Sequence, residues 1–153
     1  MHLIKGVNHV AVLTADLDRF IDFYTRVFEL EVVFSETADG FRHAILRTGP
    51  DSWLHPAEIA SNAHATGVAA MFSRGHIDHL ALTAASQDAF AEVRSRLVAS
   101  GASTGAVEDL GAFHALWFDD PDGMRGELTV IVDATLHGIH APEPLVAGAD
   151  MPN

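Results

Sequence analysis

The sequence repeats itself at a spacing of 70 residues. The stretch GVNHVAVLTA at residues 6–15 returns in altered form as HIDHLALTAA at residues 76–85. Five consecutive positions pair identical or chemically similar residues: Asn8 with Asp78, His9 with His79, Val10 with Leu80, Ala11 with Ala81 and Val12 with Leu82. We therefore expect this chain to fold as two copies of one supersecondary unit that bury a core together.

Each copy begins with a strand followed by a helix. Residues 7–13 and 77–83 are apolar, partly β-branched runs typical of strands, whereas residues 16–28 and 88–98 place apolar side chains at helical spacing. Three more strand-like stretches follow each helix, at 30–36, 41–47 and 52–59 and at 104–108, 113–118 and 124–132. The sequence thus predicts an α+β fold of two tandem βαβββ modules whose paired sheets form a half-barrel cleft.

The repeat also divides the chain into segments. We expect a first module at residues 1–59, a linker at 60–75, a second module at 76–133 and a C-terminal tail at 134–153. The linker is rich in Ala, Ser and Gly and has no clear period, which is typical of a surface connection. The tail contains three prolines and is expected to build no further domain.

Charge and composition exclude several classes of partner. The chain has 21 acidic and 9 basic residues, and its net charge of −12 repels nucleic acid and anionic membranes. It has no cysteine, which excludes disulfides and thiolate metal ligands. No window reaches the length of a membrane span, and the N-terminus lacks a signal-peptide pattern, so we expect a cytoplasmic protein.

Histidines and one glutamate recur at equivalent places in the two copies. His9 and His79 lie on the first strands, and a drift of the shift to 72 sets His55 opposite Glu127 on the last strands. Imidazoles with one carboxylate suit Zn²⁺ or the facial triad of Fe(II). Glu58 is an alternative to His55 if that strand has a different register. At a shift of 71, His43 meets His114, and both are expected to act as proton shuttles or substrate donors.

Three stretches resemble motifs of the vicinal oxygen chelate superfamily, which includes glyoxalases, bleomycin-resistance proteins and extradiol dioxygenases. They are VNHVAVLTADLDRFIDFYTRVFEL, IDHLALTAAS and FDDPDGMRGEL, and the resemblance spans about residues 6–132. It implies a cleft that holds one divalent ion (Zn, Fe(II), Ni, Mn or Co) on His9, His79 and Glu127, with His55 at the place where some members add a fourth ligand. It also implies a homodimer.

Such a site predicts a metal-dependent enzyme that chelates two neighbouring oxygens of a small-molecule substrate, with Glu127, His114 and His43 as catalytic candidates. Four protein ligands leave few open positions, which favours a lyase or isomerase over a ring-cleaving dioxygenase. The alternative is a metal-free protein that binds and sequesters a drug, as in bleomycin resistance. Its support is the acidic charge and the two tryptophans, Trp53 and Trp117, which suit an apolar groove for a cation.

Overall fold

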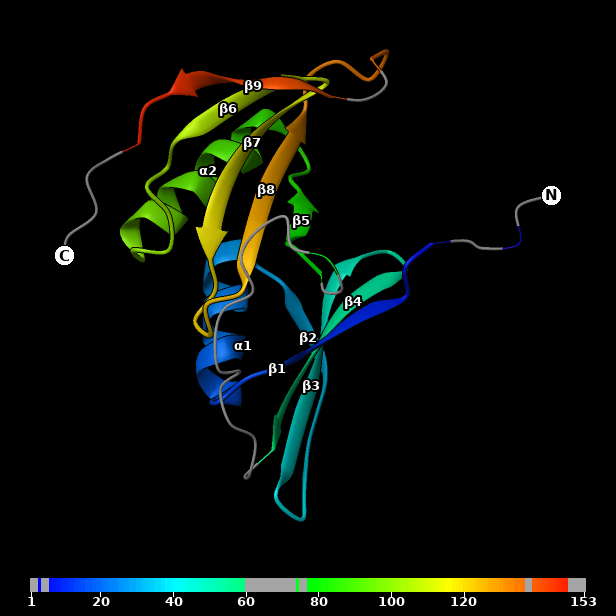
Figure 1. Ribbon diagram of the computed structural model, residues 1–153. Coiled ribbons are helices and arrows are strands. Elements are labelled where there is room, and N and C mark those ends of the chain that lie inside the picture. Colours follow the sequence, from blue (N-terminus) through cyan, green and yellow to red (C-terminus); the bar gives the residue numbers. More distant parts are fainter. Residues whose placement is uncertain (1–2, 4–5, 60–73, 75–76, 137–138, 149–153) are drawn as a thin grey trace. The chain divides into compact units, whose positions relative to one another are not determined.

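The computed structural model describes residues 3, 6–59, 74, 77–136 and 139–148. The chain divides into two units, Met1–Gly67 and Val68–Asn153. The described residues of each unit form one sheet and one helix (Figure 1). The linker expected at 60–75 lies, except for residue 74, outside the described residues.

The first unit is a four-stranded sheet with one helix. Strand order is β1-β4-β3-β2; β1 is parallel to β4 and the other pairs are antiparallel. Its elements are β1 (His9–Leu13), α1 (Leu17–Phe28), β2 (Glu31–Ala38), β3 (Phe41–Gly49) and β4 (Ser52–Ile59). Strands β1, β2 and β4 run in the same direction. The connection from β1 to β2 therefore has to cross over the sheet, and α1 is this crossover.

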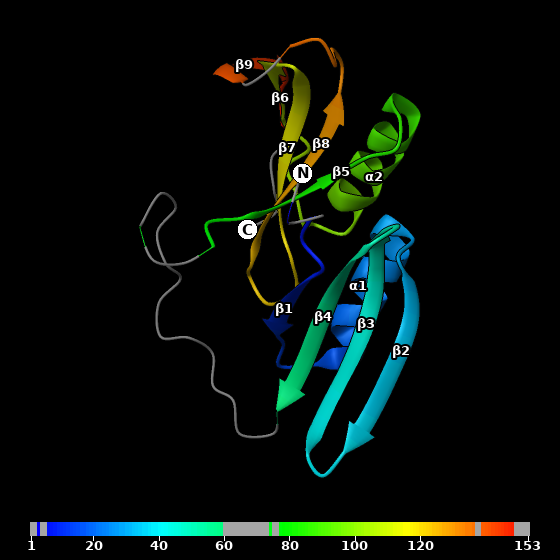
Figure 2. The same cartoon turned by 90° about the vertical axis from the view of Figure 1, so that its right-hand side faces the viewer.

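Helix α1 forms where the sequence predicts it, because its capping and apolar spacing agree. The Asp16 carboxylate accepts a hydrogen bond from the backbone N–H of Arg19 at 3.0 Å, which caps the first turn. Apolar positions three and four apart form one buried face: Leu17, Phe20, Phe23, Tyr24 and Val27. Figure 2 shows α1 behind β3 and β4, whose Leu46 and Leu54 are also buried.

The second unit repeats this design and adds a strand. Its order is β5-β8-β7-β6-β9, again with the first and last strands of the module, β5 and β8, parallel. The elements are β5 (Leu80–Thr83), α2 (Gln87–Ala99), β6 (Val107–Gly111), β7 (Phe113–Asp119), β8 (Arg125–Ile131) and β9 (Ile139–Val146). Ser86 caps α2 through the N–H of Ala89, and Phe90 and Leu97 form its buried positions.

Strand β9 was not expected from the sequence. It comes from the segment 134–153, where Pro142 and Pro144 argue against a strand because proline cannot donate to a sheet ladder. Among the described strands β9 pairs with β6 alone, at the edge of the sheet, where prolines are tolerated. The tail therefore contributes a fifth strand to the second sheet.

The predicted fold class is confirmed: two βαβββ modules, each with a mixed sheet and one helix, in an α+β chain. None of the described helices is long and apolar enough to cross a membrane.

Candidate functional site

The strand registers place His55 and Glu127 at equivalent positions in the two modules. Ala11 of β1 lies opposite His55 of β4, and Ala81 of β5 lies opposite Glu127 of β8. Since Ala11 and Ala81 are themselves equivalent in the repeat, the drift to 72 used in the sequence alignment holds on these strands. His9 and His79 each lie two residues before these alanines and on the same side of their strands.

In the second unit His79 and Glu127 are in contact. Nε2 of His79 lies 3.4 Å from Oε2 of Glu127, and the edge of the His79 ring meets the Trp117 ring at a centroid distance of 4.9 Å. The Glu127 side chain is only 9% exposed. Burial raises the pKa of the Glu127 carboxyl above its ordinary value, His79 opposes this shift, and Glu108 adds to it.

His79 lies between two carboxylates, which fixes its hydrogen bonding. Oδ2 of Asp78 is 2.9 Å from Nδ1 of His79. Because an ionised carboxylate only accepts, Nδ1 carries the proton, and the Nε2 lone pair of a neutral ring then points at Glu127. Two lone pairs that face each other at 3.4 Å need a cation between them, either a proton or a metal ion. Two donors bound about 2.1 Å from one ion at a tetrahedral angle lie about 3.4 Å apart, so the pair fits a metal.

In the first unit His9 is exposed and has an amide neighbour in place of a carboxylate. Oδ1 of Asn8 is 2.8 Å from Nδ1 of His9, and the His9 and His55 rings meet edge to face at a centroid distance of 5.7 Å. Asn8 and Asp78 are themselves paired in the repeat. In both modules the first histidine thus has an acceptor oxygen beside its Nδ1. The acceptor is a neutral amide in the first module and a carboxylate in the second.

His55 continues into a chain of hydrogen-bonding side chains. Nε2 of His55 is 3.0 Å from Nδ1 of His43, and Nε2 of His43 is 3.2 Å from Oε2 of Glu36. If the Glu36 carboxylate accepts from His43, and His43 from His55, then Nδ1 of His55 keeps its lone pair. Burial lowers the pKa of His55, and His43 and His9 act in the same direction, so the ring favours the neutral form that a metal requires.

The alignment of His43 with His114 is wrong by one residue. His43 lies opposite Ala57 on β4, whereas His114 lies opposite Val130 on β8, so the residue equivalent to His43 is Ala115. Because side chains alternate along a strand, one residue moves His114 to the opposite face of its sheet from Trp117 and Glu127. His114 is therefore not beside the His79–Glu127 pair, while His43 is beside His55.

Glu58 lies on the other face of β4 from His55, where it serves the helix. Its Oε2 accepts a hydrogen bond from the backbone N–H of Leu17 at 2.7 Å and pairs with Nη1 of Arg42 at 3.0 Å. A carboxylate at the first turn of α1 is favoured by the helix dipole. Of the two registers considered for β4, the one that points His55 toward His9 is the one observed.

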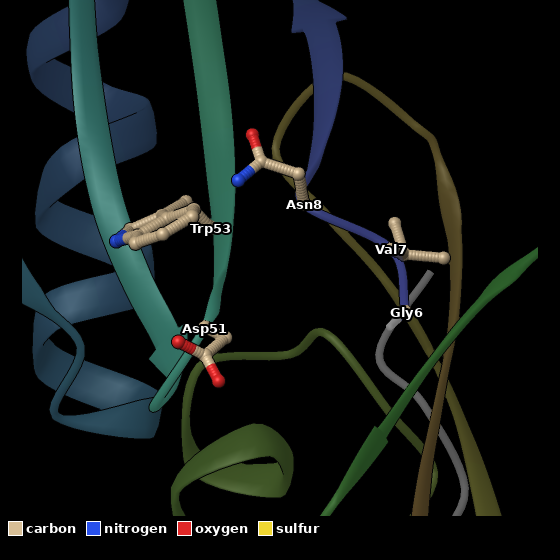
Figure 3. A pocket seen from close by; sticks show the side chains of 5 residues that line it. All are labelled: Gly6, Val7, Asn8, Asp51 and Trp53. Atoms are coloured by element: carbon tan, nitrogen blue, oxygen red, sulfur yellow. The ribbon is translucent and has the colours of Figure 1, made fainter. Parts of the chain in front are cut away.

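A pocket of about 240 Å³ lies at the start of β1 and β4. Figure 3 shows the side chains of Asn8 and Trp53 on these neighbouring strands, with Asp51 below them; Gly6 and Val7 complete the lining. The pocket offers an aromatic ring, an amide and a carboxylate beside the strand that carries His9. Within the described part of the chain, no three His, Asp or Glu side chains are grouped closely enough to hold a metal ion.

Comparison with known proteins gives the family. A family model described as the Glyoxalase/Bleomycin resistance protein/Dioxygenase superfamily matches residues 6–128. The chain belongs to this superfamily. No curated protein sequence matches the chain significantly.

Solved structures of the superfamily share the fold at low identity. A glyoxylase/bleomycin resistance protein/dioxygenase domain from Frankia sp. EAN1pec matches with a TM-score of 0.68 and 21% identity, covering 84% of this chain and 98% of that one. A lactoylglutathione lyase from Agrobacterium tumefaciens gives 0.57 and 20%, with 84% and 96% covered. The fosfomycin resistance protein FosX from Listeria monocytogenes, complexed with Mn(II) and sulfate, gives 0.58 and 18%, with 84% and 93% covered. At these identities the likeness establishes the fold alone.

Asn8 and Asp78 were not predicted as neighbours of the candidate ligands, and Trp117 was expected only to line an apolar groove. Asn8 and Asp78 touch the rings of the histidines that follow them, and Trp117 borders His79. The pairing of Asn8 with Asp78 in the repeat was a usable signal, because both side chains carry an acceptor oxygen directly before a histidine. Trp117 could have been found from its place opposite Glu127 in the hairpin of β7 and β8.

Proposed function

We propose that the protein binds one divalent metal ion through His9, His79 and Glu127, with His55 as fourth ligand, and uses it to chelate two neighbouring oxygens of a small substrate. The observation that carries this proposal is the placement of His79 between Asp78 and Glu127, which leaves two facing lone pairs that a cation satisfies. The nitrogen and oxygen donors suit Zn, Fe(II), Ni, Mn or Co. The Mn(II) in FosX supports an ion of this class on the shared fold.

When bound, the ion would act as a Lewis acid on the substrate oxygens. The chain's own residues would move the proton. Glu127 is the buried carboxylate beside His79 and is the candidate base for a proton on a carbon beside a carbonyl. His43 lies between His55 and the exposed Glu36 and is suited to exchange protons with solvent. His114, on the other face, has no part in this scheme. The reaction class that fits is a lyase or isomerase.

Metal content is the decisive test. The protein as purified, or after chelation and reloading, should contain about one divalent ion per chain by elemental analysis. His79→Ala and Glu127→Gln should abolish binding while the circular dichroism spectrum stays native. His114→Ala is the matched control, because it removes an imidazole from the opposite face of the same sheet and should retain the ion. A wild type that takes up no metal under any loading condition would sink the proposal.

The reaction class can be tested without knowing the substrate. A panel of α-hydroxycarbonyl compounds incubated with the loaded protein in D₂O should show enzyme-dependent exchange of the proton beside the carbonyl. Glu127→Gln should stop the exchange. Oxygen consumption with catechols, in place of this exchange, would assign the protein to the ring-cleaving branch.

The pocket beside β1 supports one second candidate, a metal-free protein that sequesters a cationic small molecule. Trp53 and Asp51 line it, and an aromatic ring with a carboxylate is the pair that binds quaternary ammonium or guanidinium groups. Titration of the metal-free protein with cationic drug-like compounds should then quench tryptophan fluorescence, and Asp51→Asn should weaken the effect. Wild-type affinity that is unchanged by Asp51→Asn would remove this candidate.

We also propose that the native protein is a homodimer. Strand β2 is an edge strand whose residues are all exposed, including Val32, Val33 and Phe34, and exposed apolar edges favour association. Sedimentation should give twice the chain mass of 16.4 kDa. A single species at the chain mass would contradict the dimer.

A further inference from the structure

In each module, one side chain outside the proposed ligand set contacts the first histidine of that set. Oδ1 of Asn8 lies 2.8 Å from Nδ1 of His9, and Oδ2 of Asp78 lies 2.9 Å from Nδ1 of His79. In both cases the contact is to the preceding residue, at equivalent places of the repeat, and to the same ring nitrogen. Two independent copies with the same geometry make a chance surface contact a poor explanation.

We propose that Asn8 and Asp78 are positioning residues that keep the ring proton of His9 and His79 on Nδ1 and so present Nε2 as the ligating atom, with His79 the stronger ligand of the two. This inference rests on the proposed metal site and adds to it which atom of each ring binds and which module binds first.

The chemistry of the two acceptors sets this order. The oxygen that accepts from one ring nitrogen fixes the tautomer and raises the basicity of the other nitrogen. A carboxylate accepts a charge-assisted hydrogen bond, which is roughly twice as strong as one to a neutral amide. Asp78 is therefore the better partner, and His79 also has Glu127 at 3.4 Å, whereas His9 is exposed. The pair of His79 and Glu127 thus forms the primary half of the site.

The tautomer can be measured in metal-free protein. Chelator-treated, ¹⁵N-labelled full-length protein in mildly alkaline buffer should show the imidazoles of His9 and His79 protonated at Nδ1 in long-range ¹H–¹⁵N spectra. His9→Gln and His79→Gln variants assign the signals. In Asn8→Ala and Asp78→Ala the affected ring should shift toward the Nε2-protonated form, which is the commoner tautomer of a free histidine. Wild-type rings protonated at Nε2 would overturn the inference whatever the metal does.

Metal affinity provides the second readout. Asp78→Asn should weaken binding by about 10- to 100-fold, the scale of lost supporting groups. Asn8→Ala should weaken metal binding less. Asn8→Asp should strengthen metal binding, because the first module then has a carboxylate at the place that Asp78 occupies in the second. Asp88→Asn is the matched control, since it removes the same charge from the exposed first turn of α2 and should leave affinity unchanged.

The two measurements separate failure of the inference from failure of the proposed function. Nδ1-protonated rings without any metal binding would preserve the positioning roles and overturn the metal site. Metal binding with equal losses in Asp78→Asn and Asp88→Asn would overturn the positioning role of Asp78, because the effect would then be one of net charge.

Discussion

His55 and Glu58 lie three residues apart on β4 and work on its two faces. His55 points toward His9 and His43, whereas Glu58 binds the N-terminus of α1 through the N–H of Leu17 and pairs with Arg42. The alternation of the strand makes the two roles exclusive. Because the two side chains lie on opposite faces, one substitution at each position can show which of them is the fourth ligand.

We expect His55→Ala to weaken metal binding by at least about 10- to 100-fold with little change in the fold. Glu58→Ala should leave metal binding unchanged and instead lower the free energy of unfolding by about 1–3 kcal/mol, because it leaves the Leu17 N–H without its acceptor and removes one of the two carboxylates that pair with Arg42. Isothermal titration and urea unfolding measure the two effects. Metal loss in Glu58→Ala would mean that β4 is registered differently from the structure.

The positions of the proposed ligands on their strands could be predicted from the sequence only where the register of the strand could be predicted. His9 and His79 follow from an ungapped stretch of the repeat, and His55 and Glu127 from the full drift of two residues. The pairing of His43 with His114 assumed a drift of one, whereas the drift is already two at β7. Because the side-chain period of a strand is two, an error of one residue exchanges the faces and misplaces the side chain completely.

At the scale of elements, the end of β7 and the start of β8 depend on a glycine. Gly126 lies opposite Phe118, and a Cβ at this position would overlap the Phe118 ring. Phe118 is buried and has little room to move. The residue next to Glu127 on β8 must therefore lack a side chain if the Glu127 carboxylate is to stay where it meets His79.

Gly126→Ala should lower the free energy of unfolding by about 1–3 kcal/mol, the usual scale for overpacking, and should weaken metal binding by displacing Glu127. Thermal and urea unfolding measure the first effect. Gly6→Ala is the matched control, since among the described residues a Cβ there meets no atom within 4 Å apart from those of its chain neighbours, and its change should stay within about 0.5 kcal/mol. Equal stability of both variants would show that Phe118 yields to the added methyl group.

The predictable elements were those whose periodicity and caps agree. Helices α1 and α2 carry apolar spacing of three and four behind a capping Asp16 or Ser86, and both were expected within one or two residues. Strand β9 has no such pattern, and its prolines are typical of a loop. It forms by hydrogen bonding to β6. Strands that form by pairing rather than by local preference are the ones a single sequence conceals.

For the whole molecule, binding of a metal ion to the proposed ligands His9, His79 and Glu127 should appear as a gain in stability. A metal ion bound in this way stabilises the folded chain by mass action. The net charge of −12 also attracts divalent ions without specificity, so an effect of the proposed site has to be separated from one of the acidic surface.

At a free ion concentration of about 100 times Kd, binding should add roughly 2.7 kcal/mol, which for a chain of this size raises Tm by roughly 5–10 °C. Scanning calorimetry at about 0.15 M salt, where surface charges are screened beyond about 8 Å, should show this rise with Zn²⁺, Mn²⁺, Co²⁺ or Ni²⁺. Ca²⁺, which prefers all-oxygen sites, should leave Tm unchanged, and His79→Ala should lose the rise. His9→Ala should reduce it without abolishing it, because His79 and Glu127 still hold the ion. A rise of the same size with Ca²⁺, or in His79→Ala, would assign the effect to the acidic surface and refute a site built on imidazoles.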